Sequence, residues 1–382
     1  MDAGTLKTRL DALVIFRDLL RDPVVAALSA ALSGRTAEAA AFEARLFERG
    51  DDWSRCLEAL VLNSDNVCIR RGEAKSPVLR ESMERELAFL QQLSAVQLAD
   101  LPGAADFLVP WRTSAVDIPA AFRRCVAAVG TRGYGMFARH HVFTLEEGKL
   151  VPVRHPDPQT LEELPGYERE RSRIVANTEA LLAGRGANNV LLYGDAGTGK
   201  SSTVKAIANA CADRGLRLVE VRKSQLFELP ELMDTLAENP LKFIVFIDDL
   251  SFAAGDDDFT ALKAVLEGGV GGRSGNVAVY ATSNRRHLIQ ETHSAREGDD
   301  IHAADTRQEQ MSLSARFGLI VTFEHPDKER YLRIVTELAD ACGLDREADR
   351  FLERAEGFAI RAGGRSARAA KQYVELCKAG VL

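Results

Sequence analysis

The 382-residue sequence has few of the residues that build disulfide or metal frameworks. It contains six cysteines and seven histidines, and no two cysteines stand in a C-x-x-C arrangement. Such scattered thiols argue against structural zinc and against a disulfide scaffold, and favour reduced, buried thiols in a cytoplasmic protein. The six cysteines are Cys56, Cys68, Cys125, Cys211, Cys342 and Cys377.

Long apolar runs are also missing. No stretch of about 18 uncharged apolar residues occurs, so we expect no membrane-spanning helix. Charged residues such as Lys7, Arg9 and Asp11 interrupt the N-terminal apolar residues, which argues against a signal peptide. The net charge of −7 gives no overall attraction to nucleic acid, although it does not exclude a local basic groove. The length and the 46% hydrophobic composition fit a globular protein of two or three domains.

The first third of the chain has a helical pattern, from Leu6 to about Val129. Its first apolar residues recur at the spacing of one buried helix face: Leu6, Leu10, Leu13, Phe16, Leu19 and Leu20. After Gly130 the pattern changes, and Tyr134–Phe143 with Lys149–Val153 predicts a short β-hairpin. The two prolines in 155–158 then predict a linker.

Beyond the linker, apolar strands alternate with helical segments. The predicted strands are Asn189–Tyr193, Leu216–Val221, Phe243–Ile247, Val277–Ala281 and Leu319–Phe323. Helices are predicted at Ser201–Asp213, at Phe259–Glu267 and again from Asp327 onward. This alternation predicts an α/β fold with a parallel, doubly wound sheet of five strands.

A phosphate-binding motif stands between the first of these strands and its helix. Gly194–Ser201 fits G-x-x-x-x-G-K-[ST] without a mismatch, which makes a chance glycine-rich turn a poor alternative. Its backbone N–H groups and the following helix N-terminus suit a triphosphate, Lys200 would reach the β- and γ-phosphates, and Ser201 would ligate Mg²⁺. The predicted nucleotide-binding residues here are Gly194, Asp195, Ala196, Gly197, Thr198, Gly199, Lys200, Ser201 and Ser202.

Two carboxylates end the buried strand Phe243–Ile247. Such acids are often plain turn residues or helix caps, but downstream of a phosphate loop a divalent metal explains them better. We predict that Asp248 holds Mg²⁺ through water and that Asp249 orients or deprotonates the attacking water.

The order of these segments resembles the AAA-type ATPases, members of the P-loop NTPase fold with a C-terminal helical lid. Val279–Asn284 resembles the segment of the family's first sensor, which implies that Asn284 contacts the γ-phosphate or the attacking water. Ser312–Gly318 resembles the segment that carries the arginine finger, which implies that Arg316 reaches ATP bound by a neighbouring subunit.

Two further segments extend this resemblance. Gly364–Arg368 resembles the second sensor, with Arg368 the better match and Arg365 the alternative. Leu164–Tyr167 resembles the entry segment that contacts adenine, so Gly166 and Tyr167 are expected at the nucleotide.

The pair Asp248-Asp249 departs from the family's commoner Asp-Glu, which leaves the role of Asp249 less defined. An Asp-Asp pair at this position resembles the pattern of the family branch that contains replication initiators and helicase loaders. Overall, the chain most resembles bacterial AAA-type ATPases known only as a domain of unknown function, through Asn188–Gly194, Asp248–Phe252 and Leu313–Gly318. The resemblance covers roughly Asp157 to the C-terminus, and more weakly the helical N-terminal region.

Other segments admit two interpretations. Gly268–Gly275 is either a mobile loop facing a pore or substrate, or a surface connection. Glu291–Gln310 reads as an inserted loop, and metal binding by its His293 and His302 is disfavoured. The aromatic and basic residues of Tyr134–His141 could stack on nucleic acid, but a hairpin packed on the ATPase domain is the simpler interpretation.

We therefore predict a helical N-terminal domain (1–130), a hairpin and linker (131–158), an AAA-type α/β domain (159–325) and a helical lid (326–382). The expected function is Mg²⁺-dependent ATP hydrolysis in a homo-oligomeric ring or spiral that remodels a protein or nucleic-acid partner, without a membrane. A nucleotide-gated assembly switch with negligible hydrolysis is the alternative. A small-molecule kinase is disfavoured, because the sensor and finger segments would then have no role.

Overall fold

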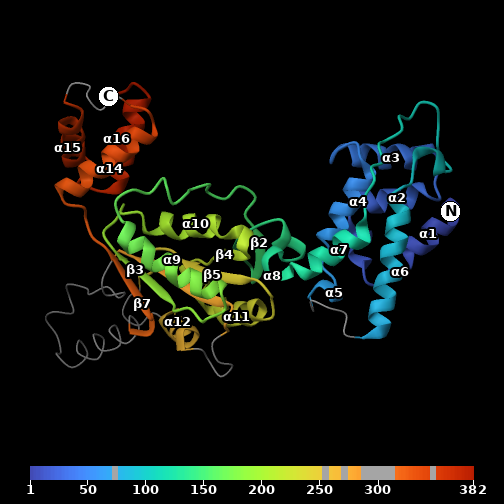
Figure 1. The fold of residues 1–382 in the computed structure, drawn as a ribbon, viewed down its shortest axis with the longest axis horizontal. Coiled ribbons are helices and arrows are strands. Elements are labelled where there is room, and N and C mark those ends of the chain that lie inside the picture. Colours follow the sequence, from blue (N-terminus) through green and yellow to red (C-terminus); the bar gives the residue numbers. More distant parts are fainter. Residues whose placement is uncertain (71–75, 252–257, 268–273, 285–314, 345–349) are drawn as a thin grey trace. The chain divides into compact units, whose positions relative to one another are not determined.

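The computed structural model describes residues 1–70, 76–251, 258–267, 274–284, 315–344 and 350–382. The chain forms two compact units, Met1–Arg139 and His140–Leu382 (Figure 1). Three features singled out in the sequence lie outside the described residues: most of Gly268–Gly275, all of Glu291–Gln310 with His293 and His302, and Ser312–Ser314.

The first unit is helical and has its own core. Phe42 of α3 meets Trp53 and Trp111 edge to face, with ring centroids 5.3 and 4.9 Å away. The Trp53 indole N–H donates to the Leu93 carbonyl at 2.8 Å, which ties α4 to the end of α6. Its α-helices are α1 (Ala3–Asp11), α2 (Pro23–Ala31), α3 (Thr36–Phe47), α4 (Trp53–Leu62), α5 (Val67–Arg70), α6 (Pro77–Leu93), α7 (Ile118–Ala127) and α8 (Val129–Arg132). Its 3₁₀ turns are Arg17–Arg21, Leu98–Asp100 and Gly135–Ala138.

The single N-terminal helix face suggested by the leucine spacing is wrong beyond Asp11, where α1 ends. The Glu86 carboxylate accepts hydrogen bonds from the backbone N–H groups of Val14, Ile15 and Phe16 at 2.9–3.1 Å. These three N–H groups therefore donate to a side chain 70 or more positions away, whereas a continuing α-helix would direct each of them to the carbonyl four residues earlier. The same apolar residues are still buried, apart from the half-buried Leu20, because the chain turns rather than continuing as one helix.

The second unit is built on a seven-stranded sheet in the order β2-β1-β4-β5-β6-β3-β7. The predicted five parallel strands are confirmed as β4 to β7 with β3, and the hairpin adds two more. The strands are β1 (Val142–Glu146), β2 (Lys149–Pro152), β3 (Val190–Gly194), β4 (Leu216–Glu220), β5 (Lys242–Ile247), β6 (Val277–Ser283) and β7 (Leu319–Phe323).

The hairpin differs from its prediction in where it starts and in what it does. The first arm begins at Val142 rather than Tyr134, since Gly135–Ala138 forms a 3₁₀ turn. β1 pairs in parallel with β4, with Val142 opposite Leu218, so the hairpin continues the sheet instead of packing on its surface.

Helices cover both faces of this sheet (Figure 1). Alternate residues of β5 show why: Ile244 and Phe246 join the core under α9 and α10, whereas Phe243 and Val245 are buried on the opposite face. The helices around the sheet are α9 (Glu168–Leu182), α10 (Lys200–Ala210), α11 (Leu229–Ala237) and α12 (Asp258–Glu267), with 3₁₀ turns at Ala212–Arg214 and Lys223–Glu228.

Three helices follow β7 and share the apolar core of the unit. They are α14 (Lys328–Ala341), α15 (Phe351–Arg361) and α16 (Ala367–Lys378). Two buried tyrosine hydroxyls fasten them together, because Tyr331 donates to the Ala355 carbonyl at 3.0 Å and Tyr373 to the Phe351 carbonyl at 2.8 Å. Below, these three helices are called the lid.

Two sequence expectations concern the whole chain. None of the described helices is both long enough and apolar enough to cross a bilayer. All six cysteines are free thiols. Burial is confirmed for Cys68, Cys125 and Cys211, whereas Cys56 and Cys377 are half-buried and Cys342 is exposed.

Candidate functional site

The phosphate loop follows β3 and ends at the first residue of α10. Gly194 is required by the neighbouring strand: a Cβ atom there would lie 2.0 Å from the Phe323 carbonyl oxygen of β7. The Asp195 N–H donates to that same carbonyl at 3.0 Å, which fixes the start of the loop against the sheet. The motif therefore has the strand–loop–helix setting that phosphate binding needs.

Lys200 is folded back over this loop and is only 6% exposed. Its ammonium donates to the Gly194 and Asp195 carbonyls at 2.8 and 2.7 Å and to the Asn284 Oδ1 atom at 3.0 Å. Burial lowers the pKa of the amine, while the nearby carboxylates of Asp195, Asp248 and Asp249 act in the opposite direction. A buried cation with acidic neighbours is thus held at the mouth of the loop.

Asp248, at the end of β5, lies beside the first turn of α10. Its Oδ1 atom accepts hydrogen bonds from the hydroxyls of Ser201 at 2.6 Å and Thr282 at 2.5 Å. A hydroxyl and a carboxylate next to a phosphate loop are the hard oxygen donors that Mg²⁺ prefers, so the predicted pair Ser201 and Asp248 fits that ion. Thr282 was not predicted, although it stands in the polar end of the sensor-like strand segment.

Asp249 has a left-handed backbone, with φ of 52°. Two contacts hold it there: its N–H donates to the Thr282 hydroxyl at 2.9 Å, and its Oδ1 atom accepts from the Asn284 amide at 2.8 Å. Because Asn284 also accepts from Lys200, its carboxamide is oriented at both ends. Lys200, Asn284 and Asp249 therefore form one continuous hydrogen-bonded chain.

These residues border a cavity of about 460 Å³. Of the predicted site residues, it is lined by Ala196, Gly197, Thr198, Gly199, Lys200, Ser201, Ser202, Asp248, Asp249, Asn284 and Arg368. Residues not predicted also line it, namely Gln159, Glu163, Leu164, Pro165, Arg171, Thr282, Ile334, Leu338, Ala367 and Lys371. Leu164 and Pro165 belong to the predicted entry segment, Thr282 and Ala367 to the two sensor-like segments, and the others to no predicted motif.

The lid contributes Arg368 through direct contact with the phosphate loop. The Arg368 N–H donates to the Gly197 carbonyl at 3.0 Å, which brings the first turn of α16 onto the loop. Arg365, the alternative second sensor, instead forms an ion pair with Glu356 of α15 and does not line the cavity. Of the two arginines, Arg368 is the one that lies at the cavity.

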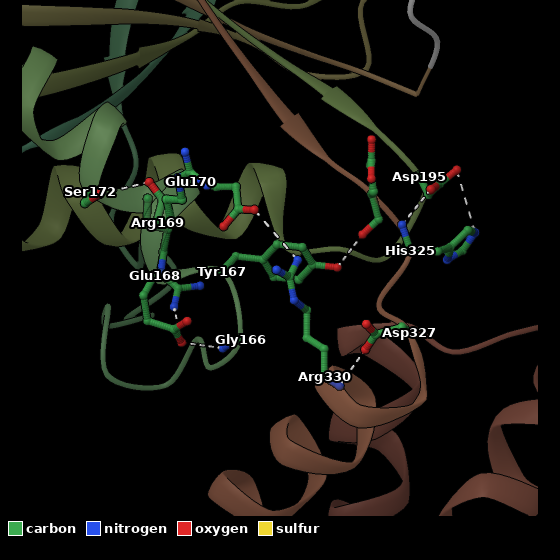
Figure 2. A network of polar contacts seen from close by, with 12 residues as sticks. Gly166, Tyr167, Glu168, Arg169, Glu170, Ser172, Asp195, His325, Asp327 and Arg330 are labelled. Atoms are coloured by element: carbon green, nitrogen blue, oxygen red, sulfur yellow. Dashed lines mark hydrogen bonds and ion pairs between the residues drawn. The ribbon is translucent and has the colours of Figure 1, made fainter.

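Gly166 and Tyr167 are placed next to the cavity wall rather than on it. Tyr167 is 1% exposed, donates to the Glu324 carbonyl at 2.6 Å, and lies under the Arg330 guanidinium at 5.2 Å from the ring centroid (Figure 2). Burial raises the pKa of its hydroxyl to about 12. Tyr167 therefore joins the segment before α9 to the connection between β7 and the lid.

Asp195 also contacts this connection instead of the cavity. Its Oδ2 atom accepts from the His325 N–H at 2.8 Å, and the His325 imidazole contacts the Arg365 carbonyl at 3.0 Å (Figure 2 shows the Asp195–His325 contact). Arg316, just before β7, is half-buried and does not line the cavity of its own chain.

Comparisons with known proteins give a family but no described relative. The family model described as "Protein of unknown function (DUF815)" matches residues 137–381. No curated protein matches the chain. A similar solved structure is a chain of the Escherichia coli MS115-1 HORMA:CdnC:Trip13 complex, at 16% identity, covering 58% of this chain and 92% of that one with a TM-score of 0.38.

The close approach of Gly166 to the lid gives a stability prediction. A Cβ atom at Gly166, which has φ of 94°, would lie 2.4 Å from Ile334 Cγ1 of α14. We expect Gly166→Ala to lower the melting temperature by about 4–8 °C, because strained backbone and overpacking together cost about 2 kcal/mol.

Gly184→Ala is the matched control. Gly184 also has a positive φ, 66°, but an added Cβ would meet nothing within 4 Å. Gly184→Ala should lower the melting temperature clearly less than Gly166→Ala does. Equal decreases in the two variants would contradict the packing argument.

Proposed function

We propose that this chain, which belongs to the DUF815 family of unknown function, binds ATP and hydrolyses it as an AAA-type ATPase. The proposal rests on the residues that line its cavity. One observation carries the proposal. The hydrogen-bonded chain of Lys200, Asn284 and Asp249 runs from the phosphate loop to a carboxylate at the carboxyl end of β5. An ATPase needs this combination of a phosphate-binding cation and a base for water in one place.

Binding would use the loop and its lysine. The Lys200 ammonium donates to two loop carbonyls and to Asn284. A triphosphate offers stronger, charged acceptors, so we propose that Lys200 turns to the β- and γ-phosphates while the loop N–H groups hold them. Ser201 and Asp248 would hold Mg²⁺, which neutralises charge on the phosphates when bound.

Hydrolysis would depend on Asp249. A carboxylate fixed by Thr282 and Asn284 can accept the proton of a water that attacks the γ-phosphorus, and Asn284 can orient that water. Arg368, on the lid, would sense the γ-phosphate, since its backbone already contacts the loop at Gly197.

Oligomerisation would complete the site. Arg316 does not line the cavity of its own chain, so a role for it in catalysis requires ATP bound by a second copy. We propose that it acts as an arginine finger in a homo-oligomer, in which hydrolysis drives a conformational change in a protein or nucleic-acid partner.

The first test concerns binding. Lys200→Ala removes the cation that offsets phosphate charge. ATP affinity should therefore fall about 10- to 100-fold, as expected when hydrogen bonds to a charged group are lost. Lys205→Ala, on the same helix but not at the cavity, is the control. Calorimetry on variants with unchanged circular dichroism measures both, and unchanged affinity in Lys200→Ala would rule out the phosphate site.

The second test separates hydrolysis from binding. Asn tolerates the left-handed backbone of Asp249, so Asp249→Asn should fold normally and bind ATP. Its phosphate release should be slower by about 10²-fold or more, the scale of lost general-base assistance. Wild-type turnover as low as that of the variant would favour an assembly switch with negligible hydrolysis.

The third test mixes two inactive variants. Lys200→Ala cannot fill its own site but still offers Arg316, whereas Arg316→Ala fills its site and lacks the finger. Arg316→Ala alone should lose about 10³- to 10⁵-fold in rate with ATP affinity nearly intact. The mixture should regain hydrolysis that neither variant shows alone, and a mixture that stays inactive although mixed oligomers form would refute action in trans.

A further inference from the structure

Outside the phosphate loop and the adjoining strand ends, part of the cavity wall is apolar. Leu164 and Pro165 come from the segment before α9, and Ile334 and Leu338 from α14 of the lid. With the triphosphate at the loop, the base of a nucleotide must occupy the rest of the cavity. Apolar side chains suit the faces of a purine ring but cannot distinguish one purine from another. Discrimination needs a polar group at the ring's edge.

Gln159 is a polar group of this wall, and it is rigidly held. It is 8% exposed, and its backbone carbonyl accepts from the Asn209 amide at 2.9 Å. The same amide donates to the Asp157 carbonyl at 2.8 Å. Asn209 belongs to α10, the helix that begins at Lys200. The position of Gln159 is therefore tied to the helix that carries the phosphate loop.

Glu163 decides which end of the Gln159 carboxamide is available. The Glu163 Oε2 atom accepts from Gln159 Nε2 at 2.7 Å and from the Thr160 N–H at 3.1 Å. A carboxylate only accepts, so the amide nitrogen of Gln159 must face it. The Oε1 atom is then left as an acceptor, and within the described ranges no protein donor is recorded for it.

We propose that Gln159 is a specificity-determining residue whose Oε1 atom accepts a hydrogen bond from the exocyclic amine of adenine. Guanine has a carbonyl oxygen at that ring position, which would face Oε1 acceptor to acceptor. The site then prefers ATP to GTP, and Glu163 acts as the positioning residue that keeps the carboxamide from turning over. The inference rests on the proposed function, because it concerns the base of the same nucleotide.

The sharpest probe is a nucleotide that lacks only the amine. Arg171 also lines the wall and is a donor, so it could favour the guanine carbonyl and blur a comparison of ATP with GTP alone. Purine riboside triphosphate carries hydrogen in place of the amine and has no carbonyl. Wild type should bind ATP about tenfold more tightly than this analogue, as expected for one hydrogen bond.

In Gln159→Leu that tenfold difference should disappear, because ATP affinity falls to that of the analogue while analogue affinity is unchanged. Equal weakening of both nucleotides would show a merely structural role and overturn the inference. Should Gln159→Leu fail to fold, equal wild-type affinities for ATP and the analogue would overturn it as well.

Glu163→Gln tests the positioning role. A carboxamide at 163 can donate as well as accept, so Gln159 is free to present its nitrogen, and the preference for ATP over the analogue should shrink several-fold. Glu162→Gln, an exposed neighbour with the same loss of charge, should leave it unchanged. Equal effects of the two variants would overturn the role of Glu163. A wild type that binds no nucleotide refutes the proposed function, whereas one that binds ATP and the analogue equally refutes only this inference.

Discussion

The parallel pairing of β3 between β6 and β7, with β5 beside β6, places the phosphate loop and the polar groups at the strand ends of the cavity. Parallel strands end at the same edge, so the phosphate loop after β3, the two carboxylates after β5 and Asn284 after β6 converge there. The convergence has an electrostatic reason. Lys200 is buried, and a buried cation is stable only with acceptors and opposite charge close by. The Gly194 and Asp195 carbonyls and Asn284 supply the acceptors, and Asp248 and Asp249 the opposite charge.

The lid is connected to this edge at several points rather than by the chain alone. The Arg368 N–H reaches the loop at Gly197, the Asp195 carboxylate holds the His325 N–H, and Tyr167 packs between Phe323 and Arg330. Loop and lid therefore share hydrogen bonds. The loop is thus in direct contact with α16 and with the connection after β7.

Local patterns were enough to predict the five parallel strands and to single out Lys200, Ser201 and Asp248, which the fold brings to one cavity. What they missed depends on contacts distant in sequence. The end of α1 depends on Glu86, and the pairing of β1 with β4 depends on a strand 70 residues further on. Gly166 and Tyr167 were expected at the nucleotide, but their burial against α14 and Glu324 is set by where the lid docks. Gln159 and Arg171 belong to no motif, and only the folded chain brings them to the cavity.

The hairpin has a consequence for how copies of this chain can meet. By joining β4, it moves the edge of the sheet out to β2, a strand of only four residues. Lys149 puts a charge at one end of that edge, and Pro152 at the other has no N–H to donate. A foreign strand therefore finds little backbone to pair with at this edge. Self-association by sheet extension, the first step of many aggregates, is therefore disfavoured at β2.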